Sequence, residues 1–433
     1  MTLSTMAFIC SSVVVVAETG MVEAAAAEAA TRDAPLLITS AANTQAVTAE
    51  IERLGAGQIV FVGEPSVQAL VPAGAEVVAA TAPQAAIGDD SPGSIPSLAT
   101  AEQIWLVRPQ DATLATVARS YLDREGGLVL ELSSEPTFDR SHTDRSYHTL
   151  GPMSPTEAWQ ARIRFVGPEL PGGGLQLFPG RRFLAFYGSP ITSRLGLLGE
   201  QGPEATMERL RPHLAEYQVP GGDPVLPAFE LIATVADSAP GRDNDYSNEL
   251  APAELQPWID VITANDGYAI IDLQSGRTDF LTQAKRYEEY LRLPNVGLAI
   301  DPEWRIGADA VHLRQIGTVD AVEVNSVVDW LADLVRSEGL PQKLFVVHQF
   351  QAPMVTGRET IRTPPELAVV IHVDGQGPLA TKYATWAAMR ELPLGADQTL
   401  WWGWKNFLDE DAPMATPLEV NAVEPLPVIV TFQ

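Results

Sequence analysis

Eight short apolar runs follow one another between residues 181 and 433, and helix-like text separates most of them. The runs are RRFLAFYG (181–188), AFELIATV (228–235), YAIIDLQ (268–274), VGLAIDP (296–302), KLFVVHQF (343–350), LAVVIHVD (367–374), TLWWGWKNF (399–407) and PVIVTFQ (427–433). Nearly continuous apolar runs are typical of parallel strands that are covered on both faces. Eight strand–helix units in about 250 residues match the size of a (β/α)8 barrel of the TIM type. We therefore predict such a barrel over residues 181–433, with an open doubly wound sheet as the alternative.

A smaller α/β domain is predicted before the barrel, over residues 36–136. Strand-like runs alternate there with segments of helical periodicity, such as LLITS (36–40) followed by TQAVTAEIERLG (44–55). This alternation indicates a parallel sheet with helices on both faces, as in Rossmann-like and flavodoxin-like domains. No G-x-G-x-x-G motif opens a helix in this region, so a dinucleotide site is not predicted.

Two further segments complete the predicted organisation. Residues 1–35 resemble a leader, because small residues suited to cleavage follow the apolar run AFICSSVVVV (7–16). No Lys or Arg precedes that run, so the alternative that it is not a signal peptide stays open; we expect a secreted or cell-surface protein. Residues 137–180 are rich in Pro and Gly and are predicted to connect the domains, with a short strand at ARIRFVG (161–167).

Composition excludes several classes of partner. The formal net charge of −27 at pH 7 argues against nucleic-acid binding, because a phosphate backbone requires a basic surface. The same charge disfavours an anionic membrane surface, and no stretch after residue 35 has the length of a transmembrane helix. The single cysteine, Cys10, excludes an internal disulfide framework and any cysteine-based zinc site.

Polar and aromatic side chains are concentrated at the C-terminal ends of the predicted barrel strands, where active sites of this fold lie. Side chains two positions apart on a strand share a face, so Asp301 and Glu303 are expected to point the same way. The side chains concerned are Tyr187, Asp272, Gln274, Asp301, Glu303, His348, Gln349, His372, Asp374, Trp402, Trp404 and Lys405. We therefore predict a site at the mouth of the barrel.

Paired carboxylates suit the cleavage of glycosidic bonds, in which one acid protonates the leaving oxygen and the other acts as nucleophile or base. Two acids held close together raise the pKa of one of them. Glu303 is the predicted proton donor, and Asp301, Asp374 and Asp272 are the candidates for the second carboxylate. The predicted contacts to sugar are Trp304, Trp402 and Trp404 by stacking, and Lys405, His348, Gln349, His372, Tyr187 and the rim residue Tyr246 by polar contact.

The end of the fourth predicted strand resembles chitinase-type and muramidase-type glycoside hydrolases. The chitinase motif is Asp-x-x-Asp-x-Asp-x-Glu; its last two acids match Asp301 and Glu303, whereas the earlier two fall on Val296 and Ala299. The family's Met-x-Tyr-Asp on the sixth strand falls on IHVD, in which Asp374 matches and the tyrosine does not. The resemblance implies a glycoside-hydrolase-like barrel and leaves the substrate and the catalytic mechanism open.

The N-terminal domain resembles the cell-wall-binding repeat of Gram-positive surface proteins. In that repeat an LL-T strand, a helix ending in RLG and a V-V-GG strand recur, and the matching pieces here are LLITS, EIERLG and IVFVGEPSVQAL. Glu64 stands where the repeat has its second glycine. The resemblance implies binding to a cell-wall glycan, and a generic α/β module that supports the second domain is the alternative.

Metal sites were weighed and none is predicted. His348 and His372 beside acids are compatible with a metal-dependent hydrolase, but the His-x-His usual on the first strand is absent from RRFLAFYG. The segment DNDYSNELAPAE (243–254) resembles a calcium-binding loop, with Asp243, Asp245, Ser247 and Glu254 at loop positions one, three, five and twelve. Its sixth position, however, is Asn248, where the loop needs Gly. The alternative is a helix start with Ser247 or Asn248 as N-cap.

Three functions follow from these observations. The first is a secreted glycoside hydrolase that acts on cell-wall or environmental polysaccharide. The second is a non-catalytic surface protein that binds glycan through the same barrel mouth. The third is a metal-dependent hydrolase. No cofactor is predicted for the first two.

Overall fold

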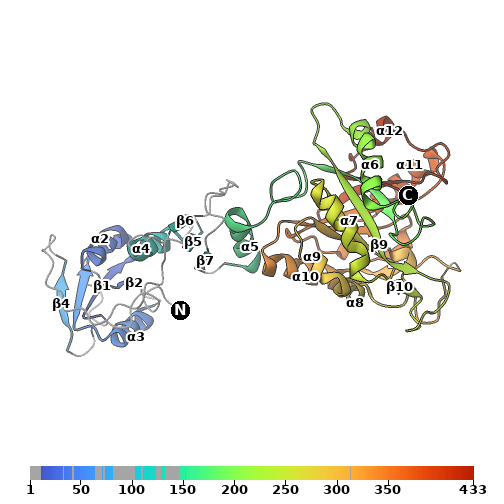
Figure 1. Cartoon of the computed structure of the whole chain (residues 1–433). Coiled ribbons are helices and arrows are strands. Elements are labelled where there is room, and N and C mark those ends of the chain that lie inside the picture. Colours follow the sequence, from blue (N-terminus) through green and yellow to red (C-terminus); the bar gives the residue numbers. More distant parts are fainter. Residues whose placement is uncertain are drawn as a thin grey trace. The chain divides into compact units, whose positions relative to one another are not determined.

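The computed structural model describes residues 11–32, 34–40, 43–63, 71, 74–80, 103–108, 111–122, 128–131, 146–151, 153–312 and 314–433. The chain divides into two compact units, Met1–Val166 and Gly167–Gln433, both drawn in Figure 1. This division falls inside the segment 137–180 that we expected to connect two domains. No helix in the described ranges is long and apolar enough to span a membrane.

A parallel four-stranded sheet opens the first unit, with the strand order β2-β1-β3-β4. Val14 and Val16 of β1 pack with Ile51 of α3, whereas Val15 and Ala17 pack with α2, so the two faces of the central strand are covered by different helices. Residues expected to form a leader thus contribute a strand and a helix. The elements are β1 (Val13–Glu18), η1 (Thr19–Met21), α2 (Val22–Arg32), β2 (Leu36–Thr39), α3 (Thr44–Leu54), β3 (Gln58–Val62) and β4 (Glu76–Ala79).

A second, three-stranded parallel sheet follows in the same unit, with the order β6-β5-β7. Its elements are β5 (Gln103–Val107), α4 (Ala112–Leu122), β6 (Leu128–Glu131), β7 (Ser146–Leu150) and α5 (Pro155–Val166). The strand predicted at 161–167 is wrong, because its first six residues belong to α5. Ser154 and Glu157 form reciprocal hydrogen bonds of 2.8 and 3.2 Å at the start of this helix, a capping box that the sequence S-P-T-E encodes.

The second unit contains a closed barrel of eight parallel strands, which confirms the predicted α/β fold class. Strand β8 pairs with both β9 and β18 and so closes the sheet, and β10 adds an antiparallel strand to β9. The barrel strands are β8 (Arg182–Gly188), β9 (Val225–Ala236), β11 (Tyr268–Leu273), β12 (Val296–Ile300), β14 (Lys343–His348), β16 (Leu367–Val373), β17 (Trp401–Asn406) and β18 (Ile429–Phe432). Each of these eight strands overlaps one of the eight predicted runs.

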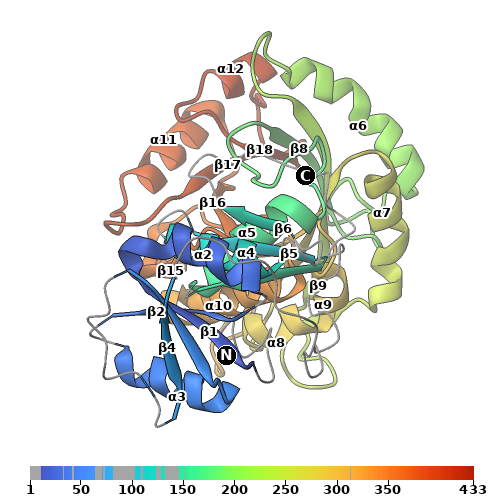
Figure 2. The same ribbon diagram turned by 90° about the vertical axis from the view of Figure 1, so that its left-hand side faces the viewer.

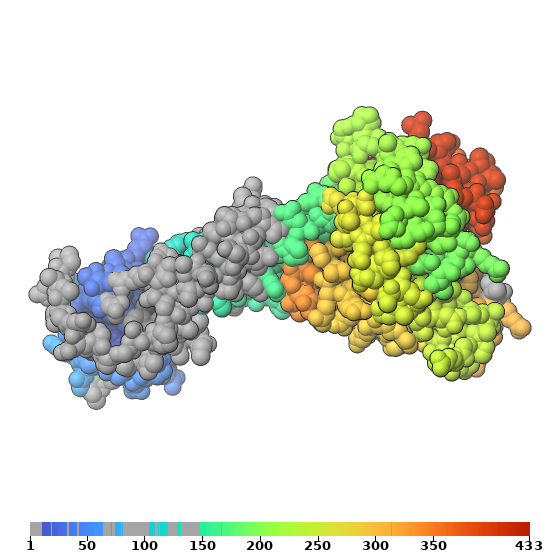
Figure 3. Space-filling model, viewed as in Figure 1, coloured from blue at the N-terminus to red at the C-terminus, as the bar shows by residue number. Residues whose placement is uncertain are grey.

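Helices surround the barrel, and Figure 2 shows α6, α7, α11 and α12 around its strands. The face of this unit seen in Figure 3 is formed largely by green and yellow residues, the part of the chain that contains α6 and α7. The remaining elements are α6 (Pro203–Tyr217), β10 (Ser247–Glu249), α7 (Pro252–Ala264), α8 (Phe280–Ala284), η5 (Lys285–Tyr287), α9 (Glu288–Leu291), η6 (Pro302–Trp304), β13 (Val319–Asp320), α10 (Ala321–Glu338), η7 (Ala352–Met354), β15 (Val355–Thr356), η8 (Arg358–Thr360), α11 (Leu379–Arg390) and α12 (Pro417–Asn421).

Alternate residues of each barrel strand fill the interior, as the two-residue period of a strand requires. One apolar cluster gathers such residues from the strands, including Ala185, Ile270, Ala299, Val346 and Val370. The same alternation, continued toward the strand ends, brings polar residues onto this interior face. The fold therefore places a polar layer above an apolar one.

Candidate functional site

Eight polar side chains form one buried layer inside the barrel, which we call the lumen cluster. Each is at most 6% exposed, and seven of the eight barrel strands or the residues next to them contribute. The members are Tyr187, Glu230, Asp272, Asp301, His348, His372, Asp374 and Lys405. Glu303, which is partly exposed in η6, lies next to this layer. The structure thus brings together the four predicted acids, Tyr187, the two histidines and Lys405.

His348 lies at the centre of the lumen cluster and contacts carboxylates through both ring nitrogens. Nδ1 lies 3.0 Å from Asp374 Oδ2, and Nε2 lies 2.9 Å from Glu230 Oε1. Burial disfavours a charged ring, but the charges and hydrogen bonds of Glu230 and Asp374 outweigh it and raise the pKa of His348 well above its usual value. Both contacts therefore favour the doubly protonated, positively charged ring.

His372 stacks on His348, with ring centroids 5.0 Å apart and an angle of 21° between the planes. Its Nε2 lies 3.1 Å from Thr431 Oγ1. Burial, together with the neighbouring charge of His348, lowers the pKa of His372 well below its usual value. The stacked pair thus contains one charged and one neutral ring.

Tyr187 and Asp272 form a second contact within the lumen cluster. The Tyr187 hydroxyl donates to Asp272 Oδ2 at 2.9 Å, and the Lys405 ammonium nitrogen lies 3.7 Å from the centroid of the Tyr187 ring. Burial raises the pKa of Asp272 to about 6, although the charge of His348 opposes the shift. Burial and Asp272 also raise the pKa of Tyr187 well above its usual value, so this phenol remains a hydrogen-bond donor.

Glu303 and Asp374 have pKa values that shift in opposite directions. Burial and the nearby charge of Asp374 raise the pKa of Glu303 to about 7. Burial also disfavours the charged form of Asp374, but the hydrogen bond and charge of His348 prevail and lower its pKa. Near neutral pH one of these acids thus holds a proton while the other is ionised, a division of roles that acid–base catalysis uses.

Asp301 precedes Glu303 and is buried beneath it. Its carboxylate accepts a hydrogen bond of 3.4 Å from the backbone N–H of Glu303 and caps η6. Burial and the neighbouring Glu303 raise the pKa of Asp301 well above its usual value. Asp301 therefore holds the turn that presents Glu303, and it is not the ionised partner.

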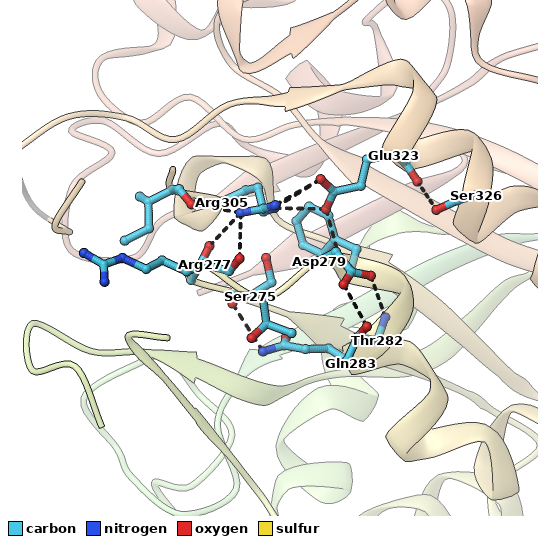
Figure 4. A network of polar contacts seen from close by, with 12 residues as sticks. Ser275, Arg277, Asp279, Thr282, Gln283, Arg305, Glu323 and Ser326 are labelled. Carbon is cyan, nitrogen blue, oxygen red and sulfur yellow. Dashed lines mark hydrogen bonds and ion pairs between the residues drawn. The ribbon is translucent and has the colours of Figure 1, made fainter. Parts of the chain in front are cut away.

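Arg305 anchors the segment that follows Glu303, and Figure 4 shows its contacts with Glu323. Its guanidinium donates to Glu323 at 2.9 Å and to the carbonyl oxygens of Arg277 at 3.1 Å and Ile306 at 2.8 Å. Glu323 also accepts a hydrogen bond of 3.1 Å from the backbone N–H of Phe280. The segments that follow β11 and β12 are therefore joined to each other and to α10.

A group of aromatic residues lies beside the Glu303 segment and includes two predicted sugar contacts, Trp304 and Tyr246. The His312 ring meets the edge of Trp304 at a centroid distance of 5.5 Å and that of Tyr246 at 6.2 Å. The Arg277 guanidinium lies 4.4 Å from the centroid of the Tyr246 ring. The Trp304 indole N–H has no hydrogen-bond partner within the described ranges. Sequence reasoning missed His312, because it lies in an irregular loop without periodicity.

Three predicted sugar contacts are wrong, because they lie on the outer face of their strands. Trp402 and Trp404 pack against Trp386 of α11 at centroid distances of 5.9 and 5.7 Å. The Trp404 indole donates to Asn406 Oδ1, so its polar group is satisfied there. Gln349 donates to the carbonyl oxygen of Gln351 and accepts from Arg358. These side chains stabilise the barrel and its loops.

Glu230 belongs to the lumen cluster although the sequence did not single it out. It lies in the middle of β9, whereas the prediction considered strand ends. The register pairs Glu230 with Tyr187, because barrel strands are staggered, and this brings the middle of β9 level with the end of β8. An acid within an otherwise apolar run was the available signal.

Among the described residues, two groups of potential metal ligands have the spacing to hold a metal ion. Glu230, Asp272 and His348 each offer one ligand atom, and these atoms lie within 4.8 Å of one another. To bind a metal ion, Nε2 of His348 needs a free lone pair, which a doubly protonated imidazolium lacks. A metal ion would therefore compete with a proton for this nitrogen.

The second group, Asp243, Asp245 and Glu249, lies in the predicted calcium loop. The twelfth residue of that loop, Glu254, instead accepts a 2.7 Å hydrogen bond from the backbone N–H of Ala251 and caps α7. The alternative helix start at Ser247 or Asn248 is also wrong, because Ser247–Glu249 form β10 and the helix begins at Pro252.

Comparisons of the chain with protein-family models, with curated proteins and with solved structures find no significant match. The resemblances to glycoside hydrolases and to a cell-wall-binding repeat therefore stay predictions.

Proposed function

We propose that the chain is a glycoside hydrolase that acts on cell-wall or environmental polysaccharide at the mouth of its barrel. The observation that carries the proposal is that Glu303 and Asp374, which follow β12 and β16, lie close together at the barrel mouth, where the pKa of Glu303 is raised to about 7 and that of Asp374 is lowered. In this reaction Glu303 donates its proton to the glycosidic oxygen as the bond to the anomeric carbon breaks. As that bond breaks, Asp374 either attacks the anomeric carbon, forming a glycosyl-enzyme that water hydrolyses in a second step, or removes a proton from a water molecule that attacks this carbon.

Other residues of the site suit the binding of a sugar. Trp304 offers a partly exposed apolar ring beside Glu303. Lys405 lies next to Glu303, Asp374 and Asp272, and it donates no hydrogen bond through its ammonium group within the described ranges. The ammonium group can therefore bind a hydroxyl group of the substrate.

The proposal is tested by digestion of a panel of polysaccharides with the wild type and with Glu303→Gln and Asp374→Asn. We expect release of reducing ends by the wild type and a loss of about 100-fold or more in either variant, since each removes one partner of the acid–base pair. Glu391→Gln, which changes an exposed glutamate after α11, is the matched control and should retain full activity.

Glycan binding without cleavage is the second candidate function. The observation that favours it is the burial of the lumen cluster, in which Asp272 and Asp301 are at most 1% exposed. Among the predicted catalytic acids only Glu303, next to the cluster, is partly exposed. Calorimetric titration with the same polysaccharides separates the two functions. Binding by the wild type with no release of reducing ends for any glycan would refute hydrolysis and favour a binding protein.

A further inference from the structure

His348 is held between two carboxylates, and this arrangement requires two ring protons. A neutral imidazole has one N–H donor and one acceptor nitrogen. Here both nitrogens lie within hydrogen-bond distance of a carboxylate oxygen, at 2.9 Å from Glu230 and 3.0 Å from Asp374. In a site that is fully buried, an unprotonated nitrogen facing an ionised carboxylate is costly. A doubly protonated ring satisfies both contacts.

The other groups around His348 show what Glu230 contributes. Lys405, on β17, is a cation and opposes a charge on His348, whereas the stacked ring of His372, on the adjacent β16, is neutral. Tyr187 lies 6.0 Å away by ring centroids, and the remaining acids are Asp272, whose Oδ1 lies 3.8 Å from Nε2, Asp301 and Glu303. Only Glu230 and Asp374 bond the ring directly within the described ranges.

Glu230 and Asp374 differ in what else they can reach. Asp374 follows β16 at the mouth, beside Glu303, whereas Glu230 lies in the middle of β9 and is completely buried. Glu230 Oε1 bonds His348, and no described group bonds its Oε2. Because Glu230 is fully buried, it cannot contact a substrate at the mouth, and its hydrogen bond goes to His348.

We infer that Glu230 is a positioning residue that holds His348 as an imidazolium, which in turn holds Asp374 ionised and oriented toward the reaction. Its importance for catalysis rests on the proposed function, whereas the protonation of His348 does not. The two parts are therefore tested by separate measurements.

The first measurement is an NMR titration of the histidine ring nitrogens in the full chain, which has six histidines. The His348 signals are assigned as those missing from His348→Asn. We expect both nitrogens of His348 to stay protonated in the wild type at pH values above the usual His pKa of about 6.5. A neutral His348 at about pH 6 in the wild type would overturn the inference, even if Glu230 variants do not fold.

The second measurement is the same titration in Glu230→Gln, which keeps the shape of the side chain and removes its charge. The protonation midpoint of His348 should fall by about one pH unit or more. Glu230→Asp, which restores the charge, should recover part of that shift. The matched control is Glu249→Gln. Glu249 is a partly buried glutamate on β10 that pairs with Arg286, and its replacement should leave the midpoint of His348 unchanged. An unchanged midpoint in Glu230→Gln would contradict the role of Glu230.

The third measurement is the pH profile of kcat/KM with a polysaccharide that the wild type cleaves. In Glu230→Gln the acidic limb should move to higher pH by about one unit, because Asp374 loses its cationic partner, while KM changes less than kcat. A purely structural role would lower activity equally at every pH. A wild type without hydrolytic activity would refute the proposed function alone, because the NMR titration decides the protonation of His348 independently.

Discussion

Arg305 forms a two-pronged ion pair with Glu323, with distances of 2.9 Å from Nε to Oε1 and 3.2 Å from Nη2 to Oε2 (Figure 4). Both side chains are largely buried, and the same guanidinium bonds backbone carbonyls of two loops. The planar fork of an arginine can make all these contacts at once, and a lysine cannot. The position of Glu303 therefore depends on a residue that does not touch Asp374.

The variant Arg305→Lys tests this dependence. We expect a loss of about 1–3 kcal/mol of stability and a fall in kcat of about tenfold, since several charged hydrogen bonds are lost and Glu303 is held less firmly. Urea unfolding and steady-state kinetics measure the two effects. Arg362→Lys, in an exposed pair with Asp329, is the matched control and should change stability by less than about 1 kcal/mol. Equal effects of the two substitutions would contradict an anchoring role for Arg305.

The pH dependence of hydrolysis follows from the two opposed acids. Glu303 must be protonated, and its pKa is about 7, so kcat/KM should fall as the pH rises above that value. Asp374 must be ionised, and because its pKa is lowered from 3.8, the acidic limb should lie below that value. A profile of kcat/KM against pH measures both limbs. A rate that keeps rising above about pH 8 would exclude Glu303 as the proton donor.

The barrel itself could be predicted from the sequence because parallel strands covered on both faces need long apolar runs. VGLAIDP and KLFVVHQF show this clearly, and both became strands with fully buried residues. The N-terminal region was harder, because Val13–Glu18 reads equally as the apolar part of a leader and as the centre of a sheet. Local hydrophobicity does not distinguish these two, whereas pairing with β2 and β3 does.

The site was predicted in part, because the period of a strand shows which residues share a face but not which face is inside. Trp402 and Trp404 have the opposite parity to Lys405, so the tryptophans and the lysine cannot both face the interior. The apolar cluster includes Trp401, on the same face as Lys405, and this settles the orientation. Glu230 was missed for a different reason, since the stagger between barrel strands cannot be read from one sequence.

Chelation tests whether the lumen cluster uses a metal ion. The nitrogen that His348 would offer to a metal lies 2.9 Å from Glu230 and carries a proton in an imidazolium. We therefore expect dialysis against a chelator to leave hydrolysis unchanged within about twofold, and added zinc to give no increase. The rate of polysaccharide cleavage before and after dialysis measures this. Loss of activity that zinc or manganese restores would favour the metal-dependent hydrolase instead.

Gly403 makes room for His372 inside the barrel. A Cβ atom at this position would lie 2.9 Å from His372 Cδ2 and 2.8 Å from Ile429 Cγ2. Gly403→Ala should therefore destabilise the chain by about 1–3 kcal/mol and lower activity, because His372 must shift against His348. Gly307→Ala, where a Cβ meets nothing within 4 Å, is the matched control and should be close to neutral. Thermal unfolding of both variants measures the difference, and equal stabilities would show that the interior can adjust.

Lys343 should make stability depend on pH in the neutral to alkaline range. Its ammonium group is completely buried at the start of β14 and donates to the carbonyl oxygens of Leu293 and Val296 at 2.9 and 2.6 Å. Burial lowers its pKa from 10.5 to about 7. Between these values the unfolded chain binds this proton more than the folded chain does, so the free energy of unfolding rises with pH.

The contribution of Lys343 to this rise is at most about 1.4 kcal/mol per pH unit, and it is absent below about pH 7, where both states hold the proton. Urea unfolding of the wild type and of Lys343→Met at several pH values isolates it, because every other titrating group is shared. We expect the difference in unfolding free energy between wild type and variant to rise in favour of the wild type above neutral pH. The matched control, Lys285→Met, changes an exposed lysine and should show a constant difference. A constant difference for Lys343→Met as well would mean that this lysine keeps its proton in the folded barrel.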